Sequence, residues 1–224
     1  SARFAAELGE LPPGPLLWLG NEFLDALPIR QFRRGAAGWT ERHVGPAGAV
    51  DLPCPPPPEA VGAVAGPGEV VEYNAAAEML VTHLATRLRE SGGAALFLDY
   101  GPSRRLAGES LQALRGGRAA DPYAAPGTAD LTAHVDFATL AAAARRCGAA
   151  VFGPLPQGVF LTRIGLFART DALARRAGPR DAAALIEAAR RLVEPDRMGG
   201  LFKAFCLAAP GFGTPAGFEP EPAP

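Results

Sequence analysis

Short apolar runs separated by polar and glycine-rich segments give the chain an alternating pattern of strands and helices. Apolar runs of strand length occur at residues 16–19, 94–98, 149–152 and 201–208. Continuous apolar runs of this length, bounded by turn residues, are typical of strands buried in a parallel sheet. We therefore predict that these four segments are strands of one central sheet.

Helices are predicted between these strands. Residues 74–90 carry a leucine at every fourth position from Leu80 to Leu88, which places the leucines on one helix face, and Asn74 is a suitable N-cap. The other predicted helices cover 136–146, with Asp136 as N-cap, and roughly 157–177 and 181–193. Strands that alternate with helices favour an α/β fold with a mostly parallel sheet.

Three segments depart from this alternation. Residues 29–34 and 39–44 are β-prone and flank a glycine-bracketed link, which predicts a hairpin. Residues 45–68 are rich in proline and glycine, which favours an irregular surface excursion. We expect residues 1–209 to form one α/β domain, with 29–68 as a hairpin and proline-rich insertion, and 210–224 to be a disordered tail.

Composition narrows the class of protein. The 224 residues are 48% hydrophobic and 20% charged, which is typical of a globular domain. The formal net charge of -1 gives no electrostatic basis for binding nucleic acid or an anionic membrane. No apolar run approaches the ~20 residues that span a bilayer. The three cysteines, Cys54, Cys147 and Cys206, are far apart, which fits a reducing compartment and a cytoplasmic location by default.

Polar residues follow two of the predicted strands, at Asn21, Glu22 and Asp25 and at Asp99 and Tyr100. Ligands of open α/β sheets bind beyond the carboxyl ends of the strands, and these two ends meet if the strands are parallel. Glu22 and Asp25 are three residues apart, so their carboxylates would share a side of a helical turn. An equally open alternative is that Asn21 and Asp25 cap a helix whose dipole Glu22 complements.

A third polar cluster contains Asp130, His134 and Asp136. This spacing is compatible with a metal site, but Asp136 is already expected to be an N-cap and no second histidine is near. We therefore expect no metal here and a structural or substrate-contacting role for His134. The sequence also lacks a P-loop, a nucleophile elbow, an HExxH motif and a dinucleotide-binding fingerprint, which argues against a dehydrogenase, a P-loop enzyme and an esterase.

Six blocks between residues 14 and 208 carry a family resemblance. In order they are GNEFLDALPIRQF, GWTERHV, LFLDYG, PGTADLTAHVDF, PLPQGVFLTRIG and PDRMGGLFKAFCLA. These blocks resemble those of the MidA-like S-adenosylmethionine-dependent methyltransferases, a family that includes a mitochondrial complex I assembly factor that methylates a protein arginine. Because all six occur in order at similar spacing, the resemblance is far more specific than any one block.

The resemblance implies a class I methyltransferase fold, a Rossmann-like seven-stranded sheet that is mostly parallel and has an antiparallel last strand. The runs at 16–19 and 94–98 would be its fourth and fifth strands, and those near 149 and 201 the final pair. The first three strands, with the loop that cradles the cofactor, would lie before Ser1. The chain is therefore expected to be the C-terminal portion of the domain.

The resemblance also implies roles for the polar residues. S-adenosylmethionine would donate a methyl group to a protein arginine, with Asn21 beside this cofactor. Glu22 and Asp25 would hold the guanidinium by charge-assisted hydrogen bonds, which leaves its opposite nitrogen placed to attack. Further residues would line the substrate side, namely Asp99, Tyr100, Asp130 and His134.

The implied partner is a protein substrate, with a respiratory complex I subunit as the example and a mitochondrial location if the source is eukaryotic. The sequence leaves one alternative of another class. The chain would then be a non-catalytic interaction or assembly module that binds a partner through the hairpin at 29–44 and the proline-rich insertion.

Overall fold

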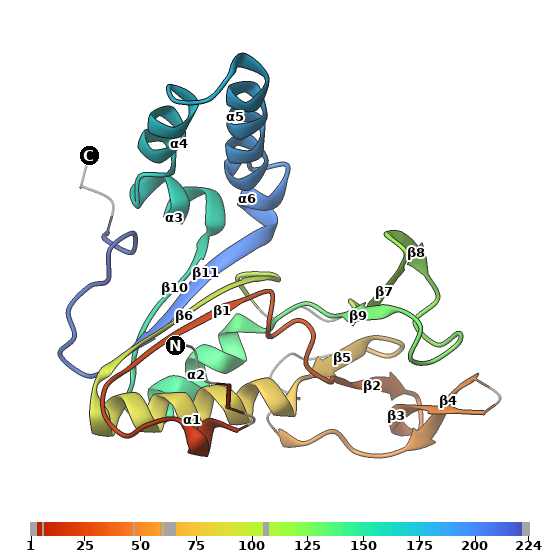
Figure 1. The fold of residues 1–224 in the computed structure, drawn as a ribbon. Helices are drawn as coiled ribbons and strands as arrows, with labels where there is room; N and C mark the ends of the chain where they lie inside the picture. The colour runs from red at the N-terminus through yellow and green to blue at the C-terminus, as the bar shows by residue number, and fades with distance from the viewer. Residues whose placement is uncertain are drawn as a thin grey trace.

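The centre of the molecule is a four-stranded sheet, from which a helical arm and a lobe of two smaller sheets extend (Figure 1). The structure is a computed structural model and describes residues 4–5, 7–46, 48–58, 60, 66–104 and 108–220. The strand order in the central sheet is β1-β6-β11-β10. Its strands are β1 (Leu16–Asn21), β6 (Gly93–Tyr100), β10 (Ala150–Pro156) and β11 (Phe202–Ala208).

The strand directions confirm the predicted α/β fold. β1 pairs with β6 in parallel, whereas β11 is antiparallel to both β6 and β10. Three strands therefore run in one direction and the last strand in sequence runs in the other. Gly93 begins β6 with a φ of 107°, and a Cβ there would lie 2.0 Å from the carbonyl oxygen of Leu16. Only glycine permits β1 to pair so closely at this point.

Two helices cover one face of the central sheet. They are α1 (Ala75–Ser91) and α2 (Phe137–Arg146), and both begin at the predicted N-caps. The Asn74 side chain accepts a hydrogen bond from Ala77 N at 2.8 Å, and Asp136 accepts one from Thr139 N at 3.1 Å. The helices and this sheet face enclose the core, in which Leu84, Leu88, Phe97, Phe137 and Phe205 are fully buried.

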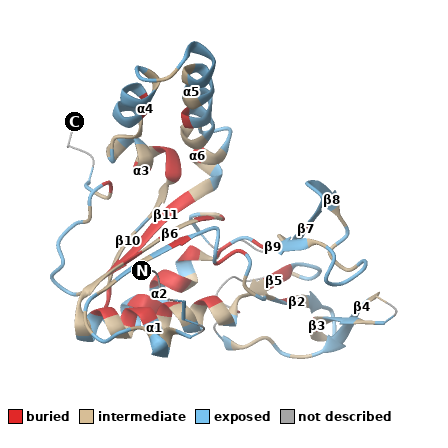
Figure 2. Cartoon of the chain, in the orientation of Figure 1, coloured by how far each residue is buried: buried red, intermediate tan, exposed pale blue. Residues whose placement is uncertain are grey.

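The opposite face is open at β1, which is an edge strand of the sheet. Leu17 is 83% exposed and Leu19 is 70% exposed, whereas the alternate positions Leu16 and Trp18 pack against the core. Figure 2 shows the contrast, with red buried residues on α1 and α2 and pale exposed ones along β1. We call this surface, formed by Leu17, Leu19 and the unpaired edge of β1, the open face.

The helical arm lies between β10 and β11 in the sequence. It consists of α3 (Gln157–Arg163), α4 (Leu166–Ala174), α5 (Pro179–Val193) and α6 (Met198–Leu201). The single helical stretch predicted at 157–177 is interrupted at Gly165, whose left-handed φ of 90° ends one helix and starts the next. Within the described part of the chain, no helix has the length and apolar character needed to cross a membrane.

The lobe contains two antiparallel sheets. One has the order β4-β3-β2-β5 and the other the order β8-β7-β9. Their strands are β2 (Arg30–Gly35), β3 (Gly38–Gly45), β4 (Gly48–Pro53), β5 (Val70–Tyr73), β7 (Gln112–Arg115), β8 (Arg118–Ala120) and β9 (Asp130–Thr132). β2 and β3 form the predicted hairpin. The expectation of no regular structure across 45–68 is wrong for β4, which pairs with β3 over its whole length.

An ionic network joins the two sheets of the lobe. Arg42 on β3 lies 3.3 Å from Asp51 and 3.0 Å from Glu109, and its guanidinium donates to the hydroxyl of Tyr123 at 3.1 Å. Arg33 on β2 contacts the same two carboxylates. The residues between β6 and β9 are thereby tied to the β2–β5 sheet, so the lobe forms one unit beside the central sheet.

Residues 210–220, for which the sequence predicts disorder, follow a path back to α3. The ring of Phe218 lies 5.2 Å from that of Phe160 and 6.3 Å from that of Phe152. The Arg163 guanidinium donates to the carbonyl oxygen of Glu219 at 2.8 Å. The last four residues of the predicted tail, 221–224, lie outside the described residues.

Candidate functional site

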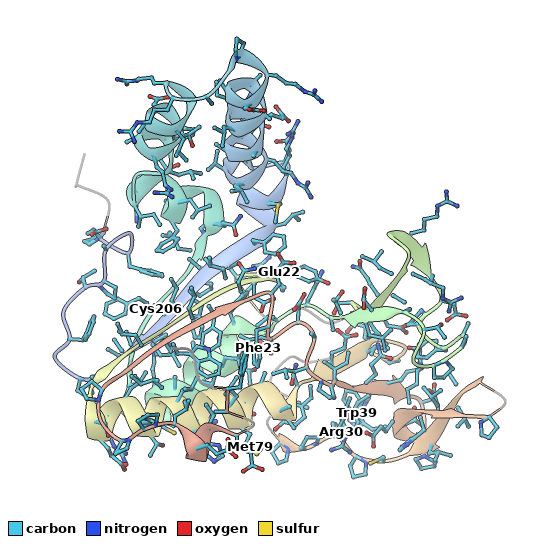
Figure 3. All side chains as sticks on the ribbon, in the orientation of Figure 1. Glu22, Phe23, Arg30, Trp39, Met79 and Cys206 are labelled. Atoms are coloured by element: carbon cyan, nitrogen blue, oxygen red, sulfur yellow. The ribbon has the colours of Figure 1, made fainter. Side chains whose placement is uncertain are left out.

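The carboxyl ends of β1 and β6 lie side by side at one end of the central sheet. The parallel pairing extends one residue beyond β1, because Glu22 N donates to the carbonyl oxygen of Leu98 at 2.8 Å. Figure 3 labels Glu22 at this end of the sheet, away from Arg30 and Trp39 in the lobe. We call this end the rim, and its polar and aromatic residues are Asn21, Glu22, Asp25, Asp99, Tyr100, Thr132, His134 and Phe202.

Asp99 anchors the chain that leaves β1. Its side chain is fully buried, and one carboxylate oxygen accepts hydrogen bonds from Phe23 N at 3.0 Å and Leu24 N at 2.7 Å. The other oxygen accepts from Tyr100 N at 3.0 Å. Burial raises the pKa of Asp99, and these backbone donors partly offset the effect. Asp99 therefore holds the loop rather than facing a ligand.

Lys203 on β11 is the strand partner of Asp99 on β6, so its side chain could be expected to form an ion pair with Asp99. Its ammonium is turned away, however, and donates to the carbonyl oxygens of Gly200 at 2.5 Å and Leu201 at 3.0 Å. Burial lowers the pKa of Lys203. No ion pair links Lys203 to the rim carboxylates within the described residues.

Asp25 is also buried, with 5% of its surface exposed, but its environment differs. Its carboxylate oxygen Oδ1 is buried and has no hydrogen-bond partner within the described structure. Burial first, and then the charges of Asp99 and Glu22, raise the pKa of Asp25 to about 6. The carbonyl oxygen of Asp25 accepts from Ala133 N at 3.0 Å, which ties this turn to the end of β9.

Glu22 and Asn21 are exposed, and neither lies on a helix. Glu22 has a left-handed φ of 47°, and the next residues form a turn closed by Leu27 N donating to Leu24 O at 3.2 Å. The helical turn considered from the sequence, and the helix cap offered as its alternative, are therefore both absent after β1. Glu22 and Asp25 are still carried by the same short loop, three residues apart.

Tyr100 forms the aromatic side of the rim. Its hydroxyl donates to Thr132 Oγ1 at 2.8 Å, and its ring packs edge-on against His134 at 5.2 Å and at a tilt against Phe202 at 5.6 Å. Burial raises the pKa of Tyr100. His134 is exposed, and its backbone N donates to Ser110 Oγ at 2.8 Å. The sequence reasoning missed Thr132 and Phe202, although both lie inside the blocks that carry the family resemblance.

Two acidic residues of the third sequence cluster stand apart from the rim. Asp130 begins β9, where it is the strand partner of Leu114, and it is exposed. Asp136 uses its carboxylate on Thr139 at the start of α2. In the described part of the chain, no three histidine, cysteine or acidic side chains are grouped so that they would hold a metal ion.

Comparison with known proteins identifies the class to which this fold belongs, the S-adenosylmethionine-dependent methyltransferases. A family model described as "Putative S-adenosyl-L-methionine-dependent methyltransferase" matches residues 1–155, and the chain belongs to that family. The relatives include the mouse protein named "Protein arginine methyltransferase NDUFAF7, mitochondrial", 35% identical over 209 residues. The alignment covers 90% of this chain and 48% of the mouse protein. The human protein of the same name is 32% identical over 212 residues, covering 90% of this chain and 47% of the human one.

Solved structures agree with the family assignment. A crystal structure from Burkholderia thailandensis with bound S-adenosyl-homocysteine matches with a TM-score of 0.73 and 30% identity, over 95% of this chain and 57% of that one. A native structure from the same organism matches with a TM-score of 0.75 and 30% identity, over 95% and 59%. The chain spans about half the length of the curated relatives it matches. Their names do not by themselves assign an activity to these residues.

Proposed function

We propose that this chain is the acceptor-binding half of a protein arginine N-methyltransferase that uses S-adenosylmethionine. The observation on which the proposal rests is the rim, where Glu22 and Asp25 lie in the loop that leaves β1, and Asp99 at the carboxyl end of the parallel strand β6 holds this loop. Carboxylates in pairs are suited to a guanidinium, which presents several N–H donors in one plane. The family assignment and the names of the relatives support the same reaction.

We further propose that the strands holding the cofactor pair with β1. In this arrangement β1 and β6 are the fourth and fifth strands of a class I sheet, and β10 and β11 are the final pair. Parallel sheets normally have both faces covered and their central strands paired on both sides. The open face, with Leu17 and Leu19 exposed, fits such a neighbour. We use the term assembled enzyme for the protein in which the proposed cofactor-holding strands are paired with β1.

The rim residues divide between the two sides of the sheet. Asn21 points to the same side as Leu17 and Leu19, because side chains alternate along a strand. It would therefore lie next to the cofactor-holding strands, and its exposed amide is suited to the polar groups of S-adenosylmethionine. The described residues provide this one side of a cofactor site. When bound, S-adenosylmethionine supplies the activated methyl group.

Glu22 would hold the guanidinium of the acceptor and set its plane. Its left-handed backbone turns the side chain out of the strand, where an arginine from another protein reaches it. Tyr100, His134 and Phe202 would contact the apolar part of the arginine side chain and its guanidinium face. Fixing both reactants in line supplies roughly 7–11 kcal/mol of the barrier to a bimolecular transfer, so positioning is a sufficient role for Glu22.

The acceptor is proposed to be a protein, with a respiratory complex I subunit as the first one to test. A mitochondrial location belongs to the proposal only for a eukaryotic source, and a cytoplasmic one otherwise.

The test is to identify the methylated atom. The assembled enzyme would be incubated with methyl-labelled S-adenosylmethionine and two matched acceptor proteins, one with its candidate arginine intact and one with that arginine changed to lysine. The proposal predicts label in N-methylarginine, and only in the first acceptor. Label on lysine would contradict the arginine specificity. No transfer and no cofactor binding by the assembled enzyme would favour the interaction-module alternative.

A further inference from the structure

The three carboxylates of the rim differ in their exposure to solvent and in their hydrogen bonds. Glu22 is exposed to solvent. Asp99 is fully buried, and both of its oxygens accept backbone hydrogen bonds. Asp25 is almost as buried as Asp99, yet its Oδ1 accepts none. Glu22 and Asp25 lie in the same short loop, so the difference in their burial comes from the residues that pack around them rather than from their position in the sequence.

The unpaired oxygen of Asp25 is unusual. Most buried polar side-chain atoms have a hydrogen-bond partner, because leaving one unpaired destabilises the fold. Within the described residues only one other buried side-chain atom, Nε1 of Trp18, shares this property. The turn that carries Asp25 is fixed by Asp99 at its start and by Ala133 N at Asp25 itself. The oxygen is therefore held in place without a permanent donor.

We infer that Asp25 Oδ1 accepts the proton that leaves the acceptor guanidinium during methyl transfer, whereas Glu22 holds the guanidinium in position. The inference rests on the proposed function and assigns the two carboxylates different tasks. The Oδ1 atom of Asp25 is buried and unpaired, whereas the carboxylate of Glu22 is exposed to water. Asp25 can therefore accept the proton of the reacting N–H group without competition from water.

The step balances as follows. A nitrogen of the guanidinium forms a bond to the methyl carbon, and the bond from that carbon to the sulfonium sulfur breaks with its electron pair on sulfur. The nitrogen loses one proton, which bonds to Oδ1 of Asp25. The products are a methylguanidinium with unchanged charge, a neutral thioether and a neutral carboxylic acid at Asp25.

The charges that face Asp25 suit this task. Besides burial, the carboxylates of Asp99 on β6 and of Glu22 on the same loop both disfavour its ionised form, and the charge of Asp25 in turn helps to raise the pKa of Tyr100 on β6. The backbone N–H groups of Ala26 and Asp25 offset part of this effect. With its pKa raised to about 6, Asp25 is ionised at neutral pH and is a stronger base than an ordinary aspartate.

The first experiment measures the protonation of Asp25 directly in this chain. Carbon-13-labelled aspartate would be incorporated, and the carboxyl resonances titrated by NMR. We expect one resonance to titrate near pH 6 and to be missing from Asp25→Asn, but to remain in Asp121→Asn, a control on an exposed carboxylate that bonds only the backbone of Tyr123. An Asp25 resonance that titrates below about pH 4.5, as in an unperturbed aspartate, overturns the inference.

The second experiment measures single-turnover methyl transfer by the assembled enzyme as a function of pH. The wild-type rate should fall below pH 6 with the protonation of one group. Asp25→Asn should lower the rate by about 100-fold or more and remove this pH dependence, and Asp25→Glu should restore part of both. Normal transfer by Asp25→Asn overturns the role of Asp25 alone. Absence of transfer in the wild type overturns the proposed function and, with it, the role.

Discussion

The two faces of the central sheet differ sharply in how the chain covers them. On one face, Phe97 and Phe205 are fully buried beneath α1 and α2. On the other, Leu17 and Leu19 are 83% and 70% exposed at the edge strand β1. Burying a leucine side chain contributes about 1.5–3 kcal/mol, so exposing two on adjacent alternate positions forgoes a sizeable stabilisation. The helices α1 and α2 bury the covered face, whereas the exposed leucines of the open face are available to pack against a further segment.

The same difference continues to the rim. The covered face ends in Asp99, and the loop that Asp99 anchors carries the buried Asp25. The open face ends in Asn21, which is exposed. In the proposed function, the loop with Asp25 belongs to the acceptor side, and the cofactor side is completed by strands that pair with β1.

The largest expected effect contrasts one substitution on each face. Phe97→Ala removes a fully buried ring and should lower the free energy of unfolding of this chain by about 3–5 kcal/mol. Leu19→Ala should change it by about 0.5 kcal/mol or less, because its side chain already contacts mostly water. Urea denaturation of both variants measures the difference. A comparable loss in the two would contradict the division into a covered and an open face.

A smaller effect is expected at the rim. The pKa of Asp25 is raised in the fold, so its stabilising contribution is present below its unfolded value of 3.8 and is lost as the pH rises through about 6. Asp25→Asn removes the cost of the buried charge and should raise the free energy of unfolding at pH 7.5. Screening by water reduces the expected gain to about 1–2 kcal/mol.

At pH 4 the gain from Asp25→Asn should nearly vanish, because the wild-type carboxyl is then protonated in the fold. Denaturation curves of the two proteins at both pH values measure this. An equal gain at pH 4 and pH 7.5 would mean that packing or a lost hydrogen bond, rather than charge, sets the stability at this position.

The sequence predicted the central sheet well because its strands are continuous apolar runs and its helices carry clear N-caps. Asn74 and Asp136 cap α1 and α2 as expected. The lobe was harder to predict. β7 and β8 are joined by Gly116–Gly117, a usable hairpin signal, but the strands themselves are short and polar. β4 lies in a proline-rich and glycine-rich segment, and only its pairing with β3 identifies it as a strand.

The sequence predicted that five polar residues would share one end of the sheet, but it did not predict how buried each of them is. Asn21, Glu22, Asp25, Asp99 and Tyr100 do meet at the end of the sheet, as parallel strands require. Asp25 could not be distinguished from Glu22 by sequence, however, because the loop that carries Asp25 is held by Asp99 and Ala133, which lie far along the chain. Thr132 and Phe202 join the rim through the same kind of long-range contact.

The most direct test of the account measures cofactor affinity and methyl transfer together in Glu22→Gln. The matched control is Glu90→Gln, an exposed carboxylate at the other end of α1 that pairs only with Arg89 among the described residues. In the assembled enzyme, Glu22→Gln should keep an S-adenosylmethionine affinity close to that of the wild type, as measured by calorimetry. Its transfer to arginine should fall by about 100-fold or more, while Glu90→Gln keeps both. Transfer by Glu22→Gln at the rate of Glu90→Gln would contradict the account.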